Sequence, residues 1–487
     1  MAVKERLYLA ADIGAGSGRL VAGRVSDGRL TLAEVTRFDN PLREHEGLLR
    51  WDVDALAGAV RRGVRSLGTA PSSLGIDTWA VDFVLVGADG EPVEPARAYR
   101  NLHTRDAVQR VHDAFDETRL YAVTGIQTQH FNSLYQLAAW NAQGARGWDR
   151  ARTFAMVPDW IAHRLGAPLA TELSNASTTQ LIDARTGDWS AELIALTGAP
   201  REWFSKPRAP GSILAERVAV EGHELALVAP ATHDTGSAVA AIPLRGERSA
   251  YISSGTWCLV GVELSAPETS EAARAANFTN EAGVDGTSRF LKNCMGLWLL
   301  QGLRNSWGAE TDFAAMVRAA ERAPAFEAPL DVDDARFFQP GSMTAAIESW
   351  WTDHGLPLPP RELGRYARAC LEGLVLAFRR ILREIERIRG VTLESVHIVG
   401  GGAQNPLLCQ WTADATGLTV MAGPVEASAL GNVIVQARAL GDVASLREAR
   451  AMIDRSFSPV VYLPRDAASW ERAARRLESL TSQGVSS

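Results

Sequence analysis

At 487 residues the chain is too long for one ordinary hydrophobic core, so we expect two or three domains. Its hydrophobic fraction of 46% and charged fraction of 22% are typical of globular proteins, and a net charge of −7 with no basic block argues against nucleic acid and anionic membranes as partners. No apolar stretch suits a signal peptide or membrane span, and the four cysteines lack metal-ligand spacing, so we expect a cytoplasmic protein with free thiols.

The first part of the chain predicts an α/β domain. Strands are expected at residues 7–11, 20–25, 30–37, 73–77 and 83–86, with a helix at 53–67. Residues 99–210 carry mainly helix and loop patterns and are predicted to be an insertion on this α/β core. A strand at 225–229 and a small-residue helix at 238–242 then return to the α/β pattern.

The polar, turn-rich residues 243–248 predict a domain boundary. Beyond them we expect strands at 250–262 around a glycine turn, at 395–399 and at 418–422, and helices at 296–307, 361–389, 405–416 and 427–440. The last residues carry two charged helical patterns. We therefore divide the chain into an N-terminal lobe (1–243), a C-terminal lobe (244–441) and a helical tail (442–487).

One local pattern occurs in both predicted lobes. Residues 10–15 (Ala-Ala-Asp-Ile-Gly-Ala) and 251–256 (Tyr-Ile-Ser-Ser-Gly-Thr) each end a strand at a glycine-bearing turn that leads into an apolar strand. Asp12 is matched by Ser253, so only the first turn offers a carboxylate. Because small residues let backbone N–H groups approach an anion, two such turns could clamp a triphosphate; two ordinary hairpins are the alternative.

Two glycine-rich segments suggest nucleotide contacts. Residues 14–18 (Gly-Ala-Gly-Ser-Gly) do not fit a dinucleotide fingerprint, which needs a following helix, and the chain has no Gly-Lys-Ser/Thr of a Walker loop. Asp12 beside this turn is expected to hold Mg²⁺ near phosphate oxygens, or else to close an Asx turn. Residues 400–402, three glycines, allow an adenine ring to lie close to the backbone, or serve tight helix–sheet packing.

A candidate general base lies where the strand at 225–229 becomes a helix. Asp234 there can be an N-cap that accepts bonds from the first free N–H groups. It can also be a base that the helix N-terminus keeps charged and that points outward between His233 and Thr235. The residues by themselves leave both interpretations open.

Taken together, these segments resemble the FGGY family of carbohydrate kinases, most closely its L-rhamnulose kinases. The similarity runs from residue 9 to about residue 440, and it is carried by the segments 12–19, 75–83, 131–137, 174–180, 233–235, 253–257, 291–301, 397–405 and 423–432. The resemblance implies an α/β fold of two actin-like, ribonuclease-H-like lobes of the actin–hexokinase superfamily, with the active site in the cleft between them. It also implies transfer of the ATP γ-phosphoryl group to the 1-hydroxyl of L-rhamnulose, a step of L-rhamnose catabolism.

The resemblance also implies roles for single residues. Asp234 matches the catalytic base. The sugar contacts it implies are Ala80, Asp82, His233, Asp234, Thr235 and Asn293, and the ATP contacts are Ala15, Gly16, Ser17, Gly18, Arg19, Thr256, Gln301 and Gly401. Ala80 departs from the family, which has a sugar-contacting glycine there, so its methyl group could crowd or trim the sugar pocket.

Two alternatives stay open at this point. The chain could phosphorylate a related ketose, such as L-fuculose, L-xylulose or L-ribulose, or it could be a sugar-sensing regulator without catalysis. Its expected partners are a small sugar and ATP, with no nucleic acid and no membrane, and we expect a monomer or a weak homodimer.

Overall fold

The computed structural model describes residues 6–144, 147–308, 311–338 and 340–483. The chain divides into two compact units, each built from segments that are distant in sequence. The first unit comprises Met1–Pro243, Glu263–Phe290 and Glu426–Phe457. The second unit comprises Leu244–Val262, Leu291–Val425 and Ser458–Ser487.

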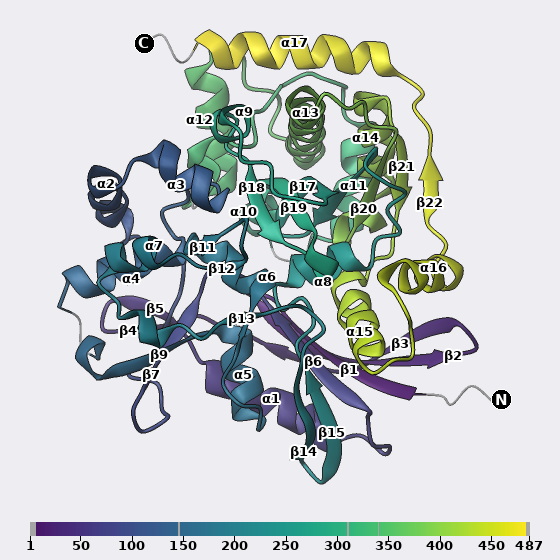
Figure 1. The fold of residues 1–487 in the computed structure, drawn as a ribbon. Helices are drawn as coiled ribbons and strands as arrows, with labels where there is room; N and C mark the ends of the chain where they lie inside the picture. Colours follow the sequence, from purple (N-terminus) through teal and green to yellow (C-terminus); the bar gives the residue numbers. More distant parts are fainter. Residues whose placement is uncertain (1–5, 145–146, 309–310, 339, 484–487) are drawn as a thin grey trace. The chain divides into compact units, whose positions relative to one another are not determined.

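The first unit is built on a six-stranded sheet in the order β14-β15-β6-β1-β2-β3 (Figure 1). Its strands are β1 (Arg6–Ile13), β2 (Ser17–Ser26), β3 (Arg29–Asp39), β6 (Ser73–Thr78), β14 (Ile213–Val220) and β15 (His223–Val228). β1, β2 and β3 form an antiparallel meander, whereas β6 and β15 run parallel to β1. The carboxyl ends of β1, β6 and β15 therefore lie at one edge of this sheet.

The alternation of side chains along β6 explains which helices cover which face of the sheet. Leu74 and Ile76 belong to the apolar core with residues of α5, whereas Ser73 and Asp77 bond to side chains of α15. Residue 75, which lies between Ser73 and Asp77 on the same face, is a glycine because a Cβ there would be 2.4 Å from the Asn432 side chain of α15. The helices of this unit outside residues 99–210 are α1 (Val53–Arg65), α8 (Asp234–Ala240), α9 (Glu271–Ala275), α15 (Ala427–Ala439) and α16 (Leu446–Ser456). The helix α5 (Val157–Arg164) lies within the predicted insertion but packs on the core of this sheet.

The predicted insertion forms its own apolar cluster, which includes Trp140, Phe154 and Trp203. Its helices are α2 (Arg105–Ala114), α3 (Glu117–Thr124), α4 (Ser133–Ala142), α6 (Leu173–Ala176) and α7 (Ala191–Thr197). The insertion also contains short strands that the sequence pattern did not predict. One of them, β9 (Ala151–Met156), pairs with β7 (Phe83–Gly87) in a sheet separate from the six-stranded one.

The second unit repeats the strand order of the first. Its strands are β16 (Ser249–Ser254), β17 (Trp257–Leu264), β20 (Ser395–Val399), β21 (Thr419–Ala422) and β22 (Val460–Tyr462). β16 pairs antiparallel with β17 and parallel with β20, which is parallel to β21. The order β17-β16-β20-β21 thus matches β2-β1-β6-β15, and the predicted internal repeat is confirmed.

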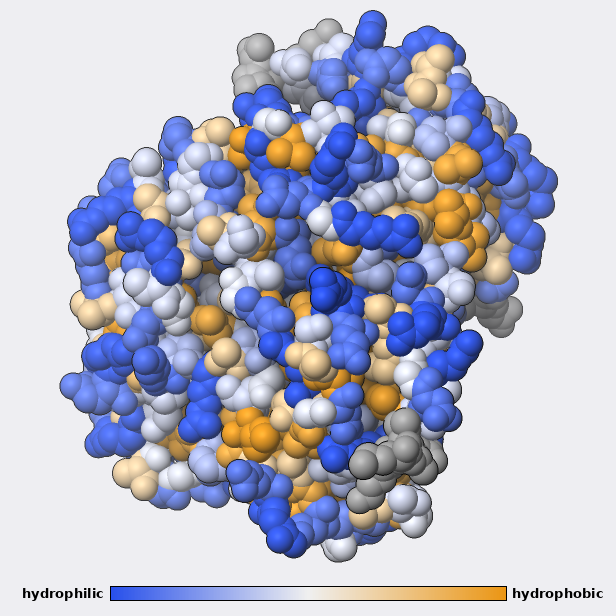
Figure 2. Space-filling model, turned by 45° about the vertical axis from the view of Figure 1, so that its right-hand side comes forward, coloured by the Kyte–Doolittle hydropathy of each residue, from blue (hydrophilic) through white to orange (hydrophobic). Residues whose placement is uncertain are grey.

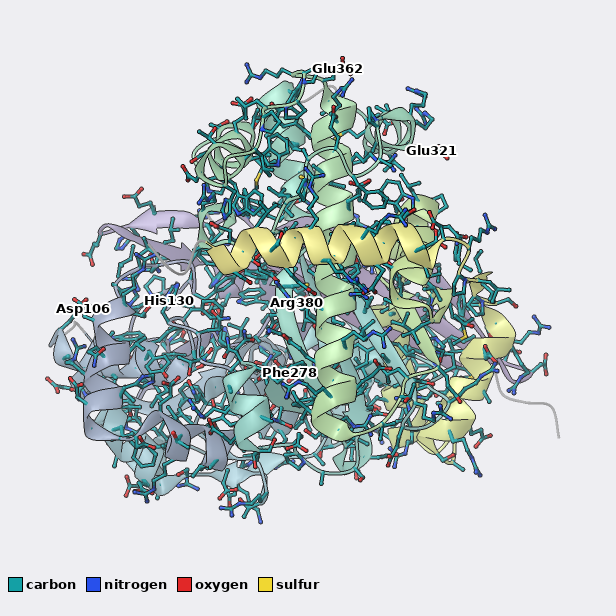
Figure 3. All side chains as sticks on the ribbon, turned by 90° about the horizontal axis from the view of Figure 1, so that it is seen from above. Asp106, His130, Phe278, Glu321, Glu362 and Arg380 are labelled. Carbon is teal, nitrogen blue, oxygen red and sulfur yellow. The ribbon has the colours of Figure 1, made fainter. Side chains whose placement is uncertain are left out.

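The long helix α13 is the main helical element of the second unit. It begins after its N-cap Glu362 and ends at Gly390, which has a positive φ of 65°, and Arg380 lies along it (Figure 3). The helix α17 crosses α13 in the same view, and Arg379 of α13 pairs with Glu471 of α17. The helices of this unit are α10 (Trp298–Trp307), α11 (Phe313–Arg322), α12 (Met343–Asp353), α13 (Leu363–Arg389), α14 (Pro406–Thr416) and α17 (Ala467–Gln483).

The compact units differ from the linear division expected from the sequence. Residues 263–290 and 426–457 belong to the first unit, although the pattern placed them in the C-terminal lobe and the tail. Long-range contacts decide this: Arg450 of α16 pairs with Glu263 and donates to the carbonyl of Ala240. Within the described residues no helix is long and apolar enough to cross a membrane, and the face shown in Figure 2 mixes hydrophilic side chains with small apolar patches.

Candidate active site

Three carboxylates belong to the strand ends at one edge of the first unit's sheet. Asp12 ends β1 and is the register partner of Asp77, which ends β6. Asp234 follows β15, and its neighbour His233 forms a parallel bridge with Thr78. Asp12 and Asp234 both act electrostatically on the buried Asp77, so the parallel register has brought three acidic groups together. An edge formed by the carboxyl ends of parallel strands is where α/β sheets bind ligands.

Asp77 is a site residue that the sequence analysis did not assign. It is fully buried, its Oδ2 accepts a 2.5 Å hydrogen bond from Asn432 Nδ2, and its Oδ1 has no hydrogen-bond partner among the described residues. Burial, and next the charge of Asp12, raise the pKa of Asp77 well above its usual value. The signal that could have found it is its position, since it ends a buried strand as Asp12 does.

The helix α15 fixes the orientation of Asp77 through a chain of amides. Gln436 Nε2 donates to Asn432 Oδ1 at 2.6 Å and to the carbonyl of Leu9 at 2.8 Å, and Ser73 Oγ donates to Gln436 Oε1 at 2.6 Å. These bonds leave Asn432 Nδ2 free to donate to the Asp77 carboxyl group. A buried network of this kind holds its members in one arrangement.

The position of Asp234 depends on close packing between α8 and α15. A Cβ at Gly431 of α15 would lie 1.7 Å from the carbonyl oxygen of Ser237 in α8, so only glycine permits this approach. Asp234 is the first residue of α8, and the N-cap is His233, so the expectation of an Asp234 N-cap is wrong. Instead Asp234 Oδ1 accepts bonds from the Thr235 backbone N–H at 2.6 Å and Thr235 Oγ1 at 3.1 Å.

The environment of Asp234 favours its protonated form more than the sequence suggested. Its side chain is 30% exposed. Removal from water raises the pKa of Asp234, His233 opposes this effect, and Asp12 adds to it, so that the net pKa is raised. The sequence analysis expected the helix N-terminus to keep this carboxylate charged, whereas burial and the charge of Asp12 act in the opposite direction.

The imidazole of His233 lies between Asp234 and a buried ion pair. Its Nε2 is 3.5 Å from Asp234 Oδ1, and its Nδ1 is 3.1 Å from both Glu281 Oε2 and Arg289 Nη2. Glu281 and Arg289 were not singled out from the sequence, because neither belongs to a motif near His233. Only the tertiary structure of the first unit brings residues 281 and 289 to this ring.

The glycine turn at residues 14–18 is closed by hydrogen bonds to its own backbone groups. Gly14 N donates to Ser17 O at 2.9 Å, and Asn40 donates to the carbonyls of Gly14 and Gly16, both at 3.1 Å. Gly18 packs against Phe38, whose ring a Cβ would approach to 2.4 Å, whereas Gly16 has open space around it. The predicted ATP contacts Ala15, Gly16 and Ser17 therefore form an accessible turn at the end of β1.

Arg19 follows this turn and forms an ion pair with Asp12, which precedes the turn. Its guanidinium donates to Asp12 Oδ2 through Nε at 3.0 Å and Nη2 at 2.8 Å, and it also pairs with Glu426. Arg19 and Asp12 are register partners on β2 and β1, which explains the contact. One Asp12 oxygen is thus occupied by Arg19.

Asp82 lies in a buried loop, and its carboxylate accepts hydrogen bonds from four surrounding groups. Its Oδ2 receives bonds from the indole N–H groups of Trp51 at 2.6 Å and Trp79 at 2.9 Å and from the Tyr99 backbone at 3.2 Å, while Gln136 bonds to Oδ1 at 3.0 Å. The side chain is only 1% exposed, and burial raises the pKa of Asp82 to about 6. These bonds place Asp82 inside the loop as its anchor.

Ala80 precedes the strained residue of this loop. Val81 has a φ of 63°, which is rare for a β-branched residue, and the Asp82 N–H donates to the Ala80 carbonyl at 2.8 Å. Ser133 Oγ holds the Val81 carbonyl at 2.5 Å. The partly exposed Ala80 is thus presented by a rigid turn.

The second unit brings together three of the predicted ATP residues. Thr256 lies in the turn between β16 and β17, and its carbonyl accepts a bond from Trp298 N at 3.3 Å at the start of α10, the helix that carries Gln301. Gly402, next to Gly401, packs against Ser254, whose Oγ a Cβ would approach to 2.2 Å. Gly401 itself is exposed, and a Cβ there would make only ordinary contacts, 3.8 Å from Leu297 Cδ1 and 3.9 Å from Ser254 O. Asn293, a predicted sugar contact, lies on β19 (Ser288–Met295) and belongs to the second unit.

The acidic edge of the first unit's sheet carries carboxylate oxygens, the kind of ligand that Mg²⁺ prefers. Across the described ranges no group of three or more His, Cys, Asp or Glu side chains is arranged to hold an ion. Mg²⁺ in nucleotide complexes, however, keeps several waters and uses only one or two carboxylates beside the phosphates. Asp12 and the unbonded Oδ1 of Asp77 supply that number of carboxylates, so the residues present fit a hydrated Mg²⁺.

Comparison with known proteins extends these observations. Models of the FGGY family of carbohydrate kinases match residues 7–236 (N-terminal domain) and 250–440 (C-terminal domain). A Rhamnulokinase of Pectobacterium carotovorum subsp. carotovorum (strain PC1) is 40% identical over 486 residues, covering 99% of this chain and 97% of its own. A Rhamnulokinase of Yersinia pestis (strain Pestoides F) is 39% identical over 472 residues, covering 95% and 97% of the two chains.

Crystal structures of sugar kinases share the fold. Xylulose kinase from Lactobacillus acidophilus has a TM-score of 0.79 at 16% identity, and gluconate kinase from the same organism has 0.81 at 15%; each comparison covers 99% of both chains. Plasmodium falciparum glycerol kinase with ADP has a TM-score of 0.76 at 13% identity, covering 99% and 97%. These matches confirm the predicted two-lobed α/β fold class. With both of its domain models matched in order along almost its whole length, the chain belongs to the FGGY family of carbohydrate kinases.

Proposed function

We propose that this carbohydrate kinase transfers the γ-phosphoryl group of ATP to the 1-hydroxyl of L-rhamnulose, with Mg²⁺ as cofactor. The similarity to proteins named Rhamnulokinase over nearly the full chain supports the choice of sugar. The observation that carries the proposal is the position of Asp234. It is a partly exposed carboxylate whose Oδ1 is fixed by Thr235, next to the acidic strand ends at Asp12 and Asp77.

Asp234 is the base in this proposal. Thr235 occupies only Oδ1, so Oδ2 is the oxygen that would accept a hydrogen bond from the sugar 1-hydroxyl. Phosphoryl transfer has a loose transition state, so Asp234 orients the hydroxyl first and takes its proton late. The raised pKa of Asp234 makes it a stronger base than an ordinary aspartate.

The remaining predicted residues would bind and orient the two substrates. His233, Thr235, Ala80 and Asn293 would contact the sugar, and the fully bonded Asp82 would act by holding the loop that presents Ala80. The backbone of residues 15–18, with Arg19, Thr256, Gln301 and Gly401, would bind ATP. The turns can contribute N–H groups to phosphate oxygens because their small residues leave the backbone accessible.

Asp12 and Asp77 would hold the Mg²⁺ ion. When bound, the ion neutralises phosphate charge in the transition state. On the protein's side, Arg19 keeps Asp12 oriented through Oδ2, and Asn432 keeps Asp77 oriented through its own Oδ2. We also infer a cytoplasmic location, supported by the four buried free cysteines, which suit a reducing compartment.

A coupled assay of ADP release tests the proposal. The purified protein is given ATP, Mg²⁺ and, in turn, L-rhamnulose, L-fuculose, L-xylulose and L-ribulose. We expect kcat/KM to be highest for L-rhamnulose. A preference for another ketose would refute the choice of sugar, and the Ala80→Gly variant would then show whether the extra methyl group causes that preference. If none of the four sugars supports ADP release, the proposal is refuted.

A further inference from the structure

The ring of His233 is backed by a buried ion pair that has no part in the proposed chemistry. Glu281 lies on β18 (Thr279–Ala282) and Arg289 on the neighbouring strand β19. Arg289 is completely buried and the Glu281 side chain is 7% exposed, and Arg289 Nη1 lies 3.0 Å from Glu281 Oε2. Burying charged groups costs free energy, and buried charges persist only where they are well paired. The contact of this pair with the His233 ring therefore indicates a role toward that ring.

Several contacts fix the guanidinium of Arg289 against His233. Arg289 Nη2 lies 3.1 Å from His233 Nδ1, and Arg289 Nε donates to the Ala282 carbonyl at 3.3 Å. The His233 backbone N–H also donates to Ser174 Oγ at 3.2 Å, which fixes the residue that carries the ring. The ring is therefore held at a defined angle.

The partners of Nδ1 decide where the ring carries its proton. Arginine only donates, so in a neutral ring Nδ1 must accept from Arg289, and the single proton is then on Nε2. In a charged ring Nδ1–H donates to Glu281, and Nε2 carries the second proton. A neutral ring with its proton on Nδ1 could donate it to Glu281, but it would also turn that proton toward the Arg289 cation and direct the Nε2 lone pair at the Asp234 carboxylate, two repulsive contacts that disfavour this state. Both acceptable states place a hydrogen on Nε2.

We infer that Glu281 and Arg289 are positioning residues that keep a proton on His233 Nε2, so that this nitrogen donates toward Asp234 Oδ1 and the bound sugar. His233 is then a donor and never a second base. Its proton counteracts the burial and the Asp12 charge that act against ionised Asp234. The charged groups facing the ring are Asp234 from α8, Glu281 from β18 and Arg289 from β19.

The inference rests on the proposed function for the part played by the sugar, but the position of the proton does not depend on which sugar is used. The first test exploits the reach of two amide side chains. In His233→Gln the amide nitrogen reaches about as far as Nε2, whereas in His233→Asn it reaches only about as far as Nδ1. We expect kcat/KM to fall about 10-fold in the first variant and about 100-fold in the second. Equal losses, or a smaller loss in His233→Asn, would overturn the inference.

The second test is a double-mutant cycle between the ion pair and the ring. Glu281→Gln should lower kcat/KM about 10-fold in the wild-type background and have little further effect in the His233→Gln background. A purely structural role of Glu281 predicts the same loss in both backgrounds and would overturn the inference. Melting curves confirm that each variant is folded. The matched control is Glu192→Gln, which removes a carboxylate from the exposed pair with Arg119 and should leave kcat/KM unchanged.

A measurement without substrate separates this inference from the proposed function. The full-length wild-type protein is labelled with ¹⁵N in its histidine rings, and the signals of His233 are those lost in His233→Gln. We expect a neutral ring protonated at Nε2 or a doubly protonated ring. A neutral ring protonated at Nδ1 would refute the inference even if L-rhamnulose is the substrate. Conversely, an Nε2 proton in a protein that phosphorylates no sugar would leave the inference standing and refute the function.

Discussion

Asp12 and Asp77 are register partners on the adjacent parallel strands β1 and β6, yet only Asp12 is neutralised by a cation, through Arg19. Asp77 instead has an amide at Oδ2 and no hydrogen-bond partner among the described residues at Oδ1. Two carboxyl groups this close cannot both be ionised at low cost, and the buried one has its pKa raised. The arrangement is suited to a group that gains its counter-charge only when a nucleotide and a cation bind.

Replacing Asp77 tests this relationship. In Asp77→Asn the amide oxygen can still accept from Asn432, while the burden of a buried carboxyl group is removed. We expect a melting temperature that is unchanged or higher near neutral pH, together with an increase of about 10-fold in the Mg²⁺ concentration needed for half-maximal activity. The control Asp106→Asn, an exposed residue in the first turn of α2, should change neither quantity. An unaltered Mg²⁺ requirement in Asp77→Asn would remove this residue from the ion site.

Replacing Asp234 tests the assignment of the base. Asp234→Asn keeps the size of the side chain and its bond with Thr235 but cannot take a proton. We expect kcat to fall by about 10³-fold, within the range for loss of a general base, while ATP binding measured by calorimetry changes less than about 3-fold. Turnover close to that of the wild type would exclude Asp234 as the base.

The buried Asp82 makes stability depend on pH in a defined direction. The pKa of Asp82 is about 6 in the folded state against 3.8 for an aspartate in water, so the folded protein binds the proton more tightly. The protonated Asp82 therefore stabilises the folded state fully below about pH 4. This stabilisation, about 3 kcal/mol, is lost as the pH rises through about 6. Asp82→Asn cannot ionise. The melting temperature of the wild type minus that of this variant should thus decrease from about pH 4 to about pH 7, and a difference that is constant with pH would contradict the assignment.

The close approach of α15 to α8 predicts a severe effect of one methyl group. In Gly431→Ala the new Cβ would meet the Ser237 carbonyl, so the two helices must separate. We expect a loss of about 3 kcal/mol in the free energy of unfolding, more than the gain of about 1 kcal/mol in helix propensity, and a clear loss of activity because α8 carries Asp234. Gly16→Ala, where a Cβ meets open space, is the matched control and should keep the wild-type stability. Equal stability of the two variants would show that the helices can move apart freely.

Several parts of this protein follow from local patterns in the sequence. The strand at 395–399 and the helices at 53–67 and 361–389 have periodicities and end signals that depend only on nearby residues, and the structure has each of them within about two residues. The strand–turn–strand repeat is also local, since a Gly-bearing turn directs the chain back along itself. Asp234 is likewise marked by a local pattern, because it lies where a predicted strand becomes a predicted helix.

Other parts depend on register and on contacts between distant segments, which no local pattern encodes. Asn432 reaches Asp77 across 355 residues of sequence, and Glu281 and Arg289 reach His233 from strands that follow it. The direction of the Asp234 pKa shift could not be deduced from the sequence for the same reason, because burial and the charge of Asp12 arise only when β1, β6 and β15 are aligned. The sequence by itself therefore determined the elements and the candidate base. The tertiary structure alone decided the direction of the pKa shift and the supporting residues of that base, because electrostatic interactions and burial act through space and not along the chain.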